Sequence, residues 1–380
     1  MARLDEIFDL QMGKTPSRSN ADYWTDGQYD WVSIADLGTY KKYVEDTKEK
    51  ISASAVQESG IKSVPANTVI MSFKLSLGKT AITQEPVYTN EAIMAFIPTG
   101  KYTVLPDYFY YLFSAKDWTK GTNRAVMGAT LNKATLGAVS VTVPPLNEQR
   151  KIVMVLDKVS DLLAKRHQQL DKLDELVKSR FIEMFGDINV NDKGWTIQPL
   201  GELCTIVRGG SPRPIEKFLG GDVPWIKIGD ATDDESIYLH STKEHIIREG
   251  VSKSRMVKAG SLIFANCGVS LGFARIITFD GCIHDGWLAM EDIDARLDKV
   301  FLLQALNQMT EHFRKIAPAG TQPNLNTAIM KAYKQIIPPM KLQKDFIAFV
   351  EQTDKSKLAI QKSLEKLEIL KRALMQKYFG

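Results

Sequence analysis

The pair of side chains best suited to proton transfer in this sequence is His284-Asp285, because a histidine beside a carboxylate can take up or release a proton near neutral pH. The remaining histidines form no HExxH or HxH cluster that could hold a metal ion: His167, His240, His245 and His312. An internal alignment of the sequence places His284-Asp285 on Asn90-Glu91. We therefore expect a position shared by two parts of the chain, and not an acid–base pair found in one part alone.

Other catalytic signatures are missing from the sequence. It has no GxxxxGK[ST] phosphate loop, and the glycine pairs Gly209-Gly210 and Gly220-Gly221 lack the strand-GxGxxG-helix context of a dinucleotide site. The two Pro-Pro pairs precede Leu146 and Met340 and so do not form the Asn/Asp-Pro-Pro-aromatic motif of adenine methyltransferases. The sequence predicts no catalytic residue and no metal ligand, and a fused enzyme such as a nuclease stays open as a minor alternative.

Composition places few limits on function. The 380 residues are 44% hydrophobic and 25% charged with a net charge of +4, so the chain can form two or more domains and its charge alone does not indicate nucleic-acid binding. No window approaches about 18 uninterrupted apolar residues, and the acidic start is unlike a signal peptide, so we expect a cytoplasmic location. Cys204, Cys267 and Cys282 have no CxxC spacing, and we interpret them as buried or incidental thiols.

Two long segments, residues 144–186 and 338–380, carry the apolar spacing of paired amphipathic helices. In the first, apolar residues recur at alternating intervals of four and three, with Arg166 at a skipped position. A shift of 194 residues places Pro144 on Pro338. The predicted seam consists of Ile152, Leu156, Val159, Leu163, Leu170, Leu173, Val177 and Met184 in the first helix and Phe346, Val350, Ile360, Leu364, Leu367 and Leu374 in the second.

The segments that precede the two helices also match each other in order. Gly13-Lys14-Thr15-Pro16 aligns with Gly209-Gly210-Ser211-Pro212, and Ser76-Leu77-Gly78 aligns with Ser270-Leu271-Gly272. The offset stays between 192 and 196 over the whole length. The chain is therefore predicted to be one globular domain plus one long helix, used twice, with domain 1 at 1–145, helix 1 at 146–186, domain 2 at 187–339 and helix 2 at 340–380.

Each globular domain is predicted to mix strands and helices, so the fold class is α+β. In domain 1 we expect a strand or helix start at 4–10, strands at 31–34, 80–83 and 138–143, and a loop at 128–132. Residues 64–73 should hold turn residues followed by a β-rich run. Residues 106–118 begin with Pro106 and have an aromatic face at i, i+3, i+4 spacing, which predicts a helix. We interpret Trp31 and Trp225 as core residues.

The duplication limits how the helices can pair. The first begins at domain 1 and ends at domain 2, and about 39 residues at about 1.5 Å each would span roughly 58 Å. The second begins at domain 2, so if it pairs with the first it must run back towards domain 1. We therefore expect an antiparallel two-helix coiled coil between two domains related by a pseudo-twofold axis.

A related hexapeptide opens each helix, Pro144-Pro145-Leu146-Asn147-Glu148-Gln149 and then Pro338-Pro339-Met340-Lys341-Leu342-Gln343. Together with the layout of two domains and two helices, this sequence resembles the DNA-specificity subunit of type I restriction-modification enzymes. The turn at 13–17, the Ser-Leu-Gly break at 76–78 and the loop at 320–326 also resemble segments of that family's target-recognition domains. The resemblance covers essentially the full chain.

This resemblance implies a non-catalytic subunit that reads a bipartite site in double-stranded DNA, one half per recognition domain, while the helices set the gap. It also implies two modification subunits that bind the helices, hold S-adenosylmethionine and methylate adenine, so that this chain itself binds no cofactor. A restriction subunit with nuclease and translocase activity can join them. Because the two domains differ in sequence, the half-sites should differ, and they should lie about one helical turn, roughly 10 bp, apart. The rival class is a coiled-coil scaffold or adaptor whose end domains bind proteins.

Under this resemblance, base reading needs loop side chains with paired donors and acceptors, chiefly Arg, Asn and Gln, while Lys and Ser contact phosphates. The candidates in domain 1 are Lys14, Ser17, Arg18, Lys74, Lys79, Arg124, Asn132 and Lys133. Those in domain 2 are Arg208, Ser211, Arg213, Lys227, Asn266, Arg275, Gln322, Asn324 and Asn326. Each of them could instead be a solvated loop residue or a turn former.

Overall fold

The computed structural model describes residues 1–380 except 75, 120–122, 126–127, 233–235, 269 and 319–322, and only the backbone of 123–125 and 128–130. The chain divides into two compact units. Unit 1 contains Met1–His167 and Gln361–Gly380, and unit 2 contains Gln168–Ile360. Because each division falls inside a long helix, each unit holds one globular domain together with part of both helices.

Unit 1 has two main sheets. Its strands are β1 (Ala2–Arg3), β2 (Phe8–Met12), β3 (Tyr29–Val32), β4 (Glu49–Ile51), β5 (Val69–Ser72), β6 (Thr80–Ile82), β7 (Tyr88–Thr89), β8 (Ile93–Pro98), β9 (Asn123–Ala125), β10 (Gly128–Thr130) and β11 (Ser140–Val141). Its short helices are α1 (Leu4–Ile7), α2 (Ile34–Leu37), α3 (Ala53–Ser59), α4 (Pro106–Ala115) and α5 (Lys133–Gly137). The sheets have the orders β2-β8-β5-β6 and β4-β3-β7. Two further strand pairs, β1-β11 and β9-β10, complete the described part of the unit.

Unit 2 is built in the same way. Its strands are β12 (Thr196–Pro199), β13 (Thr205–Arg208), β14 (Leu219–Ile226), β15 (Tyr238–Leu239), β16 (Glu244–Ile246), β17 (Arg255–Val257), β18 (Leu262–Ala265), β19 (Ala274–Ile277), β20 (Gly281–Ile283), β21 (Trp287–Glu291) and β22 (Lys334–Ile337). Its short helices are α7 (Leu200–Leu203), α8 (Arg248–Val251), α9 (Lys299–Gln308), α10 (Thr310–Ile316) and α11 (Thr327–Ala332). The sheets have the orders β13-β21-β18-β19-β15 and β16-β14-β20-β17, and β12 pairs with β22.

The repeat predicted from the sequence is confirmed by the strand order. The run β2-β8-β5-β6 of unit 1 corresponds to β13-β21-β18-β19 of unit 2. Each second sheet contains one parallel pair at the same place, with Trp31 opposite Tyr88 and Trp225 opposite Cys282. The predicted α+β class is confirmed as well, because each unit mixes helices with largely antiparallel sheets.

Several expected elements have different bounds. The helix expected at 106–118 is α4, which ends at Ala115, and the β-rich run expected to follow turn residues within 64–73 is β5. The loop expected at 128–132 is wrong for its first three residues, which form β10 and pair antiparallel with β9. The strand expected at 31–34 ends at Val32, because the Ser33 hydroxyl accepts a hydrogen bond from Asp36 N and so caps helix α2.

The core of unit 1 joins its sheet to a long helix. Phe8 of β2 packs edge-on against Phe96 of β8 and Phe109 of α4, with ring centroids 5.6 and 4.9 Å away. The same buried cluster includes Ile152 and Leu156, which lie on the long helix α6 (Leu146–Phe185). Helix α4 therefore connects the sheet to α6.

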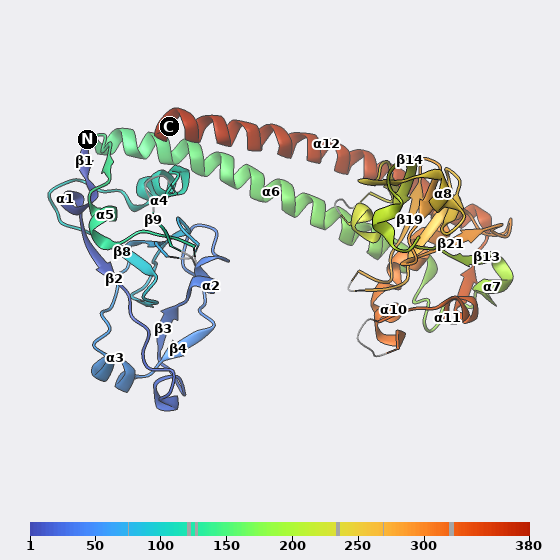
Figure 1. Ribbon diagram of the computed structural model, residues 1–380, viewed down its shortest axis with the longest axis horizontal. Helices are drawn as coiled ribbons and strands as arrows, with labels where there is room; N and C mark the ends of the chain where they lie inside the picture. Colours follow the sequence, from blue (N-terminus) through green and yellow to red (C-terminus); the bar gives the residue numbers. More distant parts are fainter. Residues whose placement is uncertain (75, 120–122, 126–127, 233–235, 269, 319–322) are drawn as a thin grey trace. The chain divides into compact units, whose positions relative to one another are not determined.

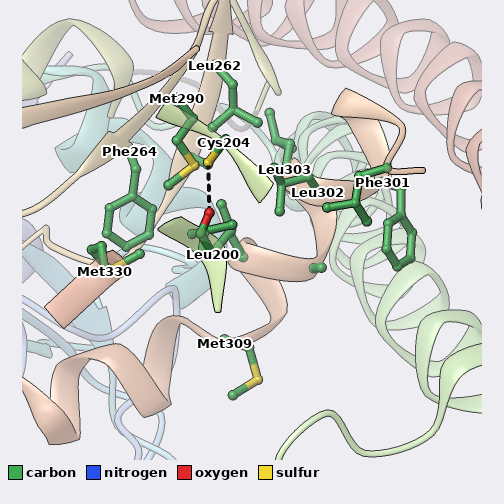
Figure 2. Close-up of a cluster of buried hydrophobic side chains, with 14 of the residues drawn as sticks. Leu200, Cys204, Leu262, Phe264, Met290, Phe301, Leu302, Leu303, Met309 and Met330 are labelled. Atoms are coloured by element: carbon green, nitrogen blue, oxygen red, sulfur yellow. Dashed lines mark hydrogen bonds between the residues drawn. The ribbon is translucent and has the colours of Figure 1, made fainter. Parts of the chain in front are cut away.

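The core of unit 2 contains an equivalent cluster (Figure 2). It includes Leu200, Cys204, Leu262, Phe264, Met290, Phe301, Leu302, Leu303, Met309 and Met330. The Cys204 thiol donates to the Leu200 carbonyl at 3.4 Å, and burial raises the pKa of Cys204 to about 12. Cys204 is therefore a buried, unreactive thiol, as interpreted from the sequence.

Helix α6 and helix α12 (Met340–Phe379) pack against each other within each unit (Figure 1). In unit 1 the first half of α6 shares a cluster with Leu374 and Phe379 at the end of α12. In unit 2 the last turns of α6 meet the start of α12, and the Phe181 ring lies 5.4 Å from that of Phe346. The two helices therefore run antiparallel. None of the helices within the described ranges combines the length and hydrophobicity needed to cross a membrane.

The predicted seam residues all lie on the covered sides of these helices. Those that are buried are Ile152, Leu156, Val159, Val177, Phe346, Val350 and Leu364. Those that are half-buried are Leu163, Leu170, Leu173, Met184, Ile360, Leu367 and Leu374. The sequence pattern missed Phe181 and Phe185, which are 1% and 0% exposed and belong to the seam of unit 2.

A buried glutamine fastens each long helix to its own globular domain. Gln149 accepts a hydrogen bond from Leu105 N at 2.9 Å and donates to the carbonyls of Thr103 and Pro144, both at 2.9 Å. Gln343 does the same in unit 2: it accepts from Asp298 N and donates to the carbonyls of Arg296 and Pro338. Both glutamines are fully buried. This explains why each opening hexapeptide ends in glutamine.

Candidate nucleic-acid interface

Several predicted contact residues lie in the loop that follows β2 in unit 1 and in the loop that follows β13 in unit 2. We call residues 13–18 and 209–213 the recognition loops. Gly13 N donates to Ile93 O at 3.1 Å, and Gly209 N donates to Trp287 O at 2.9 Å. A Cβ at Gly13 would lie 2.2 Å from Thr89 O, and one at Gly209 would lie 2.2 Å from His284 O. Both loops therefore begin at a glycine because a side chain would collide with the neighbouring backbone.

A hydroxyl and a carboxylate tie each recognition loop to the loop before β8 or β21. In unit 1 the Thr15 hydroxyl donates to Glu91 Oε2, and it accepts from Asn90 Nδ2 at 3.0 Å. In unit 2 the Ser211 hydroxyl donates to Asp285 Oδ1 at 2.8 Å. We call these two pairs the hydroxyl clamps.

Cations surround the hydroxyl clamp of unit 2. Arg208 Nε donates to the Asp285 carbonyl at 3.0 Å, and Arg213 Nη2 lies 3.9 Å from Asp285 Oδ2. Lys227 pairs with Glu244 and lies 5.7 Å from the centre of the Trp225 ring. The Arg213 side chain is 80% exposed, so its guanidinium is open to an anionic ligand such as a phosphate.

His284 belongs to this cluster as a loop residue. Its Nδ1 accepts from Gly286 N at 2.9 Å, and its Nε2 lies 3.0 Å from Asp285 Oδ1. Burial lowers its pKa, and although Asp285 opposes this, the nearby Lys227, Arg213 and Arg208 add to it. Both ring nitrogens are thus engaged inside the loop, which supports the interpretation of a shared structural position over an acid–base pair. No group of three or more potential metal-ligating side chains occurs among the residues that the structure describes.

A second pair of loops meets beside the clamp in unit 2. Asn266 is fully buried and donates from Nδ2 to Asn324 Oδ1 at 3.2 Å, while its carbonyl accepts from Leu325 N at 2.7 Å. Asn266 N in turn donates to Gly286 O at 2.9 Å. Asn266 therefore presents no surface in this conformation and instead positions Asn324.

The candidates of the unit 1 recognition loop are held by contacts within the protein. Lys14 Nζ donates to the Ser59 carbonyl, and the Ser17 hydroxyl lies 2.7 Å from that of Ser19. Arg18 pairs bidentately with Glu49, with Nη2 and Oε2 2.9 Å apart, and its Cζ lies 3.6 Å from the centre of the Trp24 ring. The hydrogen bond to Glu49 raises the pKa of Arg18. Arg18 therefore has a fixed direction, and half of its side chain remains exposed.

Several other candidates have structural roles. Asn132 and Asn326 are the N-caps of α5 and α11, and their Oδ1 atoms accept from Thr135 N and Ile329 N at 2.8 and 2.9 Å. Lys133 is exposed at the start of α5. Arg275 lies on β19, where its guanidinium packs 4.7 Å from the Phe273 ring centre. The two asparagines therefore cap helices and Arg275 belongs to a strand, so each has a structural role.

The remaining candidates are Lys74, Lys79, Arg124 and Gln322. Lys74 is half-buried, 5.2 Å above the Phe73 ring, and Lys79 is exposed. Arg124 is in β9, but its side chain lies outside the described residues, as does all of Gln322. Trp31 and Trp225 are 1% and 4% exposed, so their interpretation as core residues is confirmed.

Comparison with known proteins decides the family. The model for the type I restriction modification DNA specificity domain matches residues 1–175 and again 192–371. The chain belongs to this family. The chain, called the specificity chain below after its family, is 24% identical over 400 residues to the MjaIX specificity subunit of Methanocaldococcus jannaschii. The match covers 99% of the chain and 91% of that relative. It is 28% identical over 194 residues to the EcoR124I/EcoR124II specificity subunit of Escherichia coli, covering 49% and 46% of the two proteins.

Solved structures have the same fold as the specificity chain. A chain from a structure on the complex assembly and conformational transition of a type I restriction-modification system is 17% identical with a TM-score of 0.64, covering 100% of this chain and 96% of that one. The S subunit from M. genitalium is 15% identical with a TM-score of 0.56, covering 100% and 95%. The fold, with two domains and two long helices, is therefore shared with these structures.

Sequence reasoning missed the residues that fasten the recognition loops. Thr15, Glu91 and Asp285 were absent from the predicted contact residues because the prediction favoured side chains with paired donors and acceptors, chiefly Arg, Asn and Gln. The internal repeat carried the signal, since it aligns Thr15 with Ser211 and Glu91 with Asp285. A hydroxyl aligned with a hydroxyl and an acid with an acid indicates a paired contact in each copy.

Proposed function

We propose that the specificity chain reads a bipartite DNA sequence, one half with the globular domain of unit 1 and the other half with that of unit 2. The observation that carries this proposal is the repeated recognition loop with different side chains. In one copy Lys14, Ser17 and Arg18 follow the glycine, and in the other Gly210, Arg213 and Pro214 stand at the corresponding places. Two loops of one backbone design with different donors should read two different half-sites.

The long helices are proposed to set the gap between the half-sites. Gln149 and Gln343, each buried with three hydrogen bonds, attach a domain rigidly to the helix that follows it. A rigid attachment is needed if helix length is to determine spacing, because a loose joint would let each domain choose its own distance.

We also propose that the chain is non-catalytic and works with two modification subunits that hold S-adenosylmethionine and methylate adenine, and that a restriction subunit can join this complex. Exposed apolar side chains on the helices support a protein-docking role. On α6, Val155, Leu162 and Leu176 are 37%, 39% and 48% exposed and recur at heptad intervals, while Leu358 of α12 is 53% exposed. The expected docking surface on the helices is therefore partly apolar.

The proposal is tested by co-expressing the chain with its modification subunit and mapping methylated adenines over a whole genome. We expect one asymmetric motif of two different half-sites separated by unspecified bases. Methylation without a defined motif, or sequence-independent binding at all salt concentrations, would favour the scaffold or adaptor alternative.

A further inference from the structure

We propose that the hydroxyl clamps, Thr15–Glu91 and Ser211–Asp285, are positioning pairs that determine how strictly each recognition loop reads its own half-site. This inference rests on the proposed function, because it assumes that the recognition loops meet DNA. It assigns a role to four residues that do not themselves read bases.

The two clamps occupy the same place in the fold. Each hydroxyl lies just beyond the end of the first strand of the main sheet, and each carboxylate lies just before the strand that pairs with it. The pairing of β2 with β8 extends to Met12 opposite Met94, and that of β13 with β21 extends to Arg208 opposite Leu288. The clamp therefore continues the connection between two loops after the strand pairing has ended.

Backbone hydrogen bonds hold only the first part of each recognition loop. In unit 1, Gly13 N and Lys14 N donate to Ile93 O and Thr89 O, and in unit 2 Gly209 N and Gly210 N donate to Trp287 O and Ile283 O. The next residue in each loop is the clamp residue, Thr15 or Ser211. A hydroxyl bound to a carboxylate is a charge-assisted hydrogen bond, stronger than one between neutral groups. Losing it should free the exposed end of the loop and leave the strand pairing intact.

The carboxylate of each clamp also acts on the arginine of its loop. Asp285 Oδ2 lies 3.9 Å from Arg213 Nη2. The hydrogen bond to Glu49 raises the pKa of Arg18 most, burial lowers it, and the charge of Glu91 adds a smaller increase. A carboxylate facing DNA would repel the phosphates, yet both copies carry one. Each carboxylate accepts a hydrogen bond from the hydroxyl of its own recognition loop, and this bond fixes the loop.

The test deletes one hydroxyl at a time in the complex reconstituted with the modification subunit. Thr15→Val and Ser211→Ala each remove one clamp, while Thr15→Ser and Ser211→Thr keep the hydroxyl by exchanging the natural residues of the two copies. The matched control is Thr205→Val, because the Thr205 hydroxyl donates to Asp292 Oδ2 at 3.2 Å at the opposite end of the same strand pair. Methylation rates are measured on DNA with single base substitutions in either half-site.

We expect Thr15→Val to reduce base discrimination roughly tenfold in the half-site read by unit 1 and to leave the other half-site unchanged, as the loss of one charge-assisted bond would. Ser211→Ala should do the reverse, and the exchanged variants and Thr205→Val should keep full discrimination. Glu91→Gln and Asp285→Asn, which keep the side-chain size, should reproduce the loss.

Two outcomes would overturn the inference while the wild-type complex still methylates its motif. One is full discrimination by every hydroxyl-deleted variant. The other is an equal loss in both half-sites, which would mean that the clamps only stabilise the fold. If the wild-type complex methylates no defined motif, the proposed function fails first, and the inference fails with it.

Discussion

The ammonium nitrogen of Lys42 lies 2.6 Å from Asp157 Oδ1 of helix α6 and 2.7 Å from Asp107 Oδ1 of α4. The Tyr111 hydroxyl donates to the same Asp157 oxygen at 2.6 Å. The Lys42 side chain is 16% exposed, and although burial alone would lower its pKa, the bonds to Asp107 and Asp157 outweigh this and raise it. This cluster joins a loop, a short helix and a long helix of unit 1.

Replacing Lys42 with Met should destabilise unit 1, because two carboxylates would then share a poorly solvated site without a cation. We expect a loss of about 1–3 kcal/mol, which is below the range for fully buried pairs since Asp157 is 37% exposed. Urea unfolding measures it. The control is Arg3→Met, which removes the exposed pair Arg3–Asp5 and should change stability far less, because solvent screens an exposed pair. Equal losses in both variants would contradict the role of the cluster.

Removing the buried glutamine of either hexapeptide should be strongly destabilising. Gln149→Ala or Gln343→Ala leaves one backbone N–H and two carbonyls without their partner, and we expect a cost of about 2–4 kcal/mol. Differential scanning calorimetry on the full chain measures it. Gln168→Ala on the exposed side of α6 is the control, with a change within about 0.5 kcal/mol. A loss no larger than this in the Gln149 variant would show that the anchor is dispensable.

The pH dependence of stability should differ between the units because only unit 2 carries His284. Its pKa in the folded protein is lowered below the ordinary 6.5, chiefly by burial. Asp285 raises this pKa, but the three nearby cations lower it further. The unfolded chain therefore takes up the proton more readily, so this contribution to stability is complete above pH 6.5 and is lost as pH falls below it.

Substituting His284 with Asn, the residue at the aligned position Asn90, tests this sign. Thermal unfolding followed between pH 7.5 and 5 should show the wild type losing more stability on acidification than His284→Asn. An identical pH profile for both proteins would mean that His284 does not titrate differently on unfolding.

Arg213 is the exposed cation of the unit 2 loop and should contact DNA. Arg213→Ala is expected to weaken DNA binding by the assembled complex and to reduce the slope of log affinity against log salt by about 1 if the contact is to a phosphate. Arg248→Ala is the control, since its side chain is equally exposed at 82% and also pairs with an aspartate, Asp222. If both variants bind as the wild type does across the salt series, the recognition loop of unit 2 is not at the interface.

The sequence was sufficient for the architecture, because an internal repeat and a helical seam depend on patterns that survive without coordinates. It was not sufficient for the contacts between a long helix and its domain or for the contacts between distant loops. The predicted seam did not include Phe181 and Phe185. The last turns of α6 pack into the unit 2 core, so their buried residues no longer follow the heptad spacing. Asn266 was expected to read bases and is fully buried, because its role depends on a partner, Asn324, far away in the chain. Polar contacts between loops that are distant in the chain produce no periodic pattern in the sequence, so they could not be predicted from it.

The central claim is that two domains read two half-sites at a distance set by the helices. The most direct measurement lengthens both α6 and α12 by one heptad, which keeps the seam in phase and adds about 10 Å, or roughly three base pairs. Methylated adenines are then mapped with the modification subunit present. We expect unchanged half-site sequences and a gap longer by about three bases. An unchanged gap in an active complex, or altered half-site sequences, would contradict it.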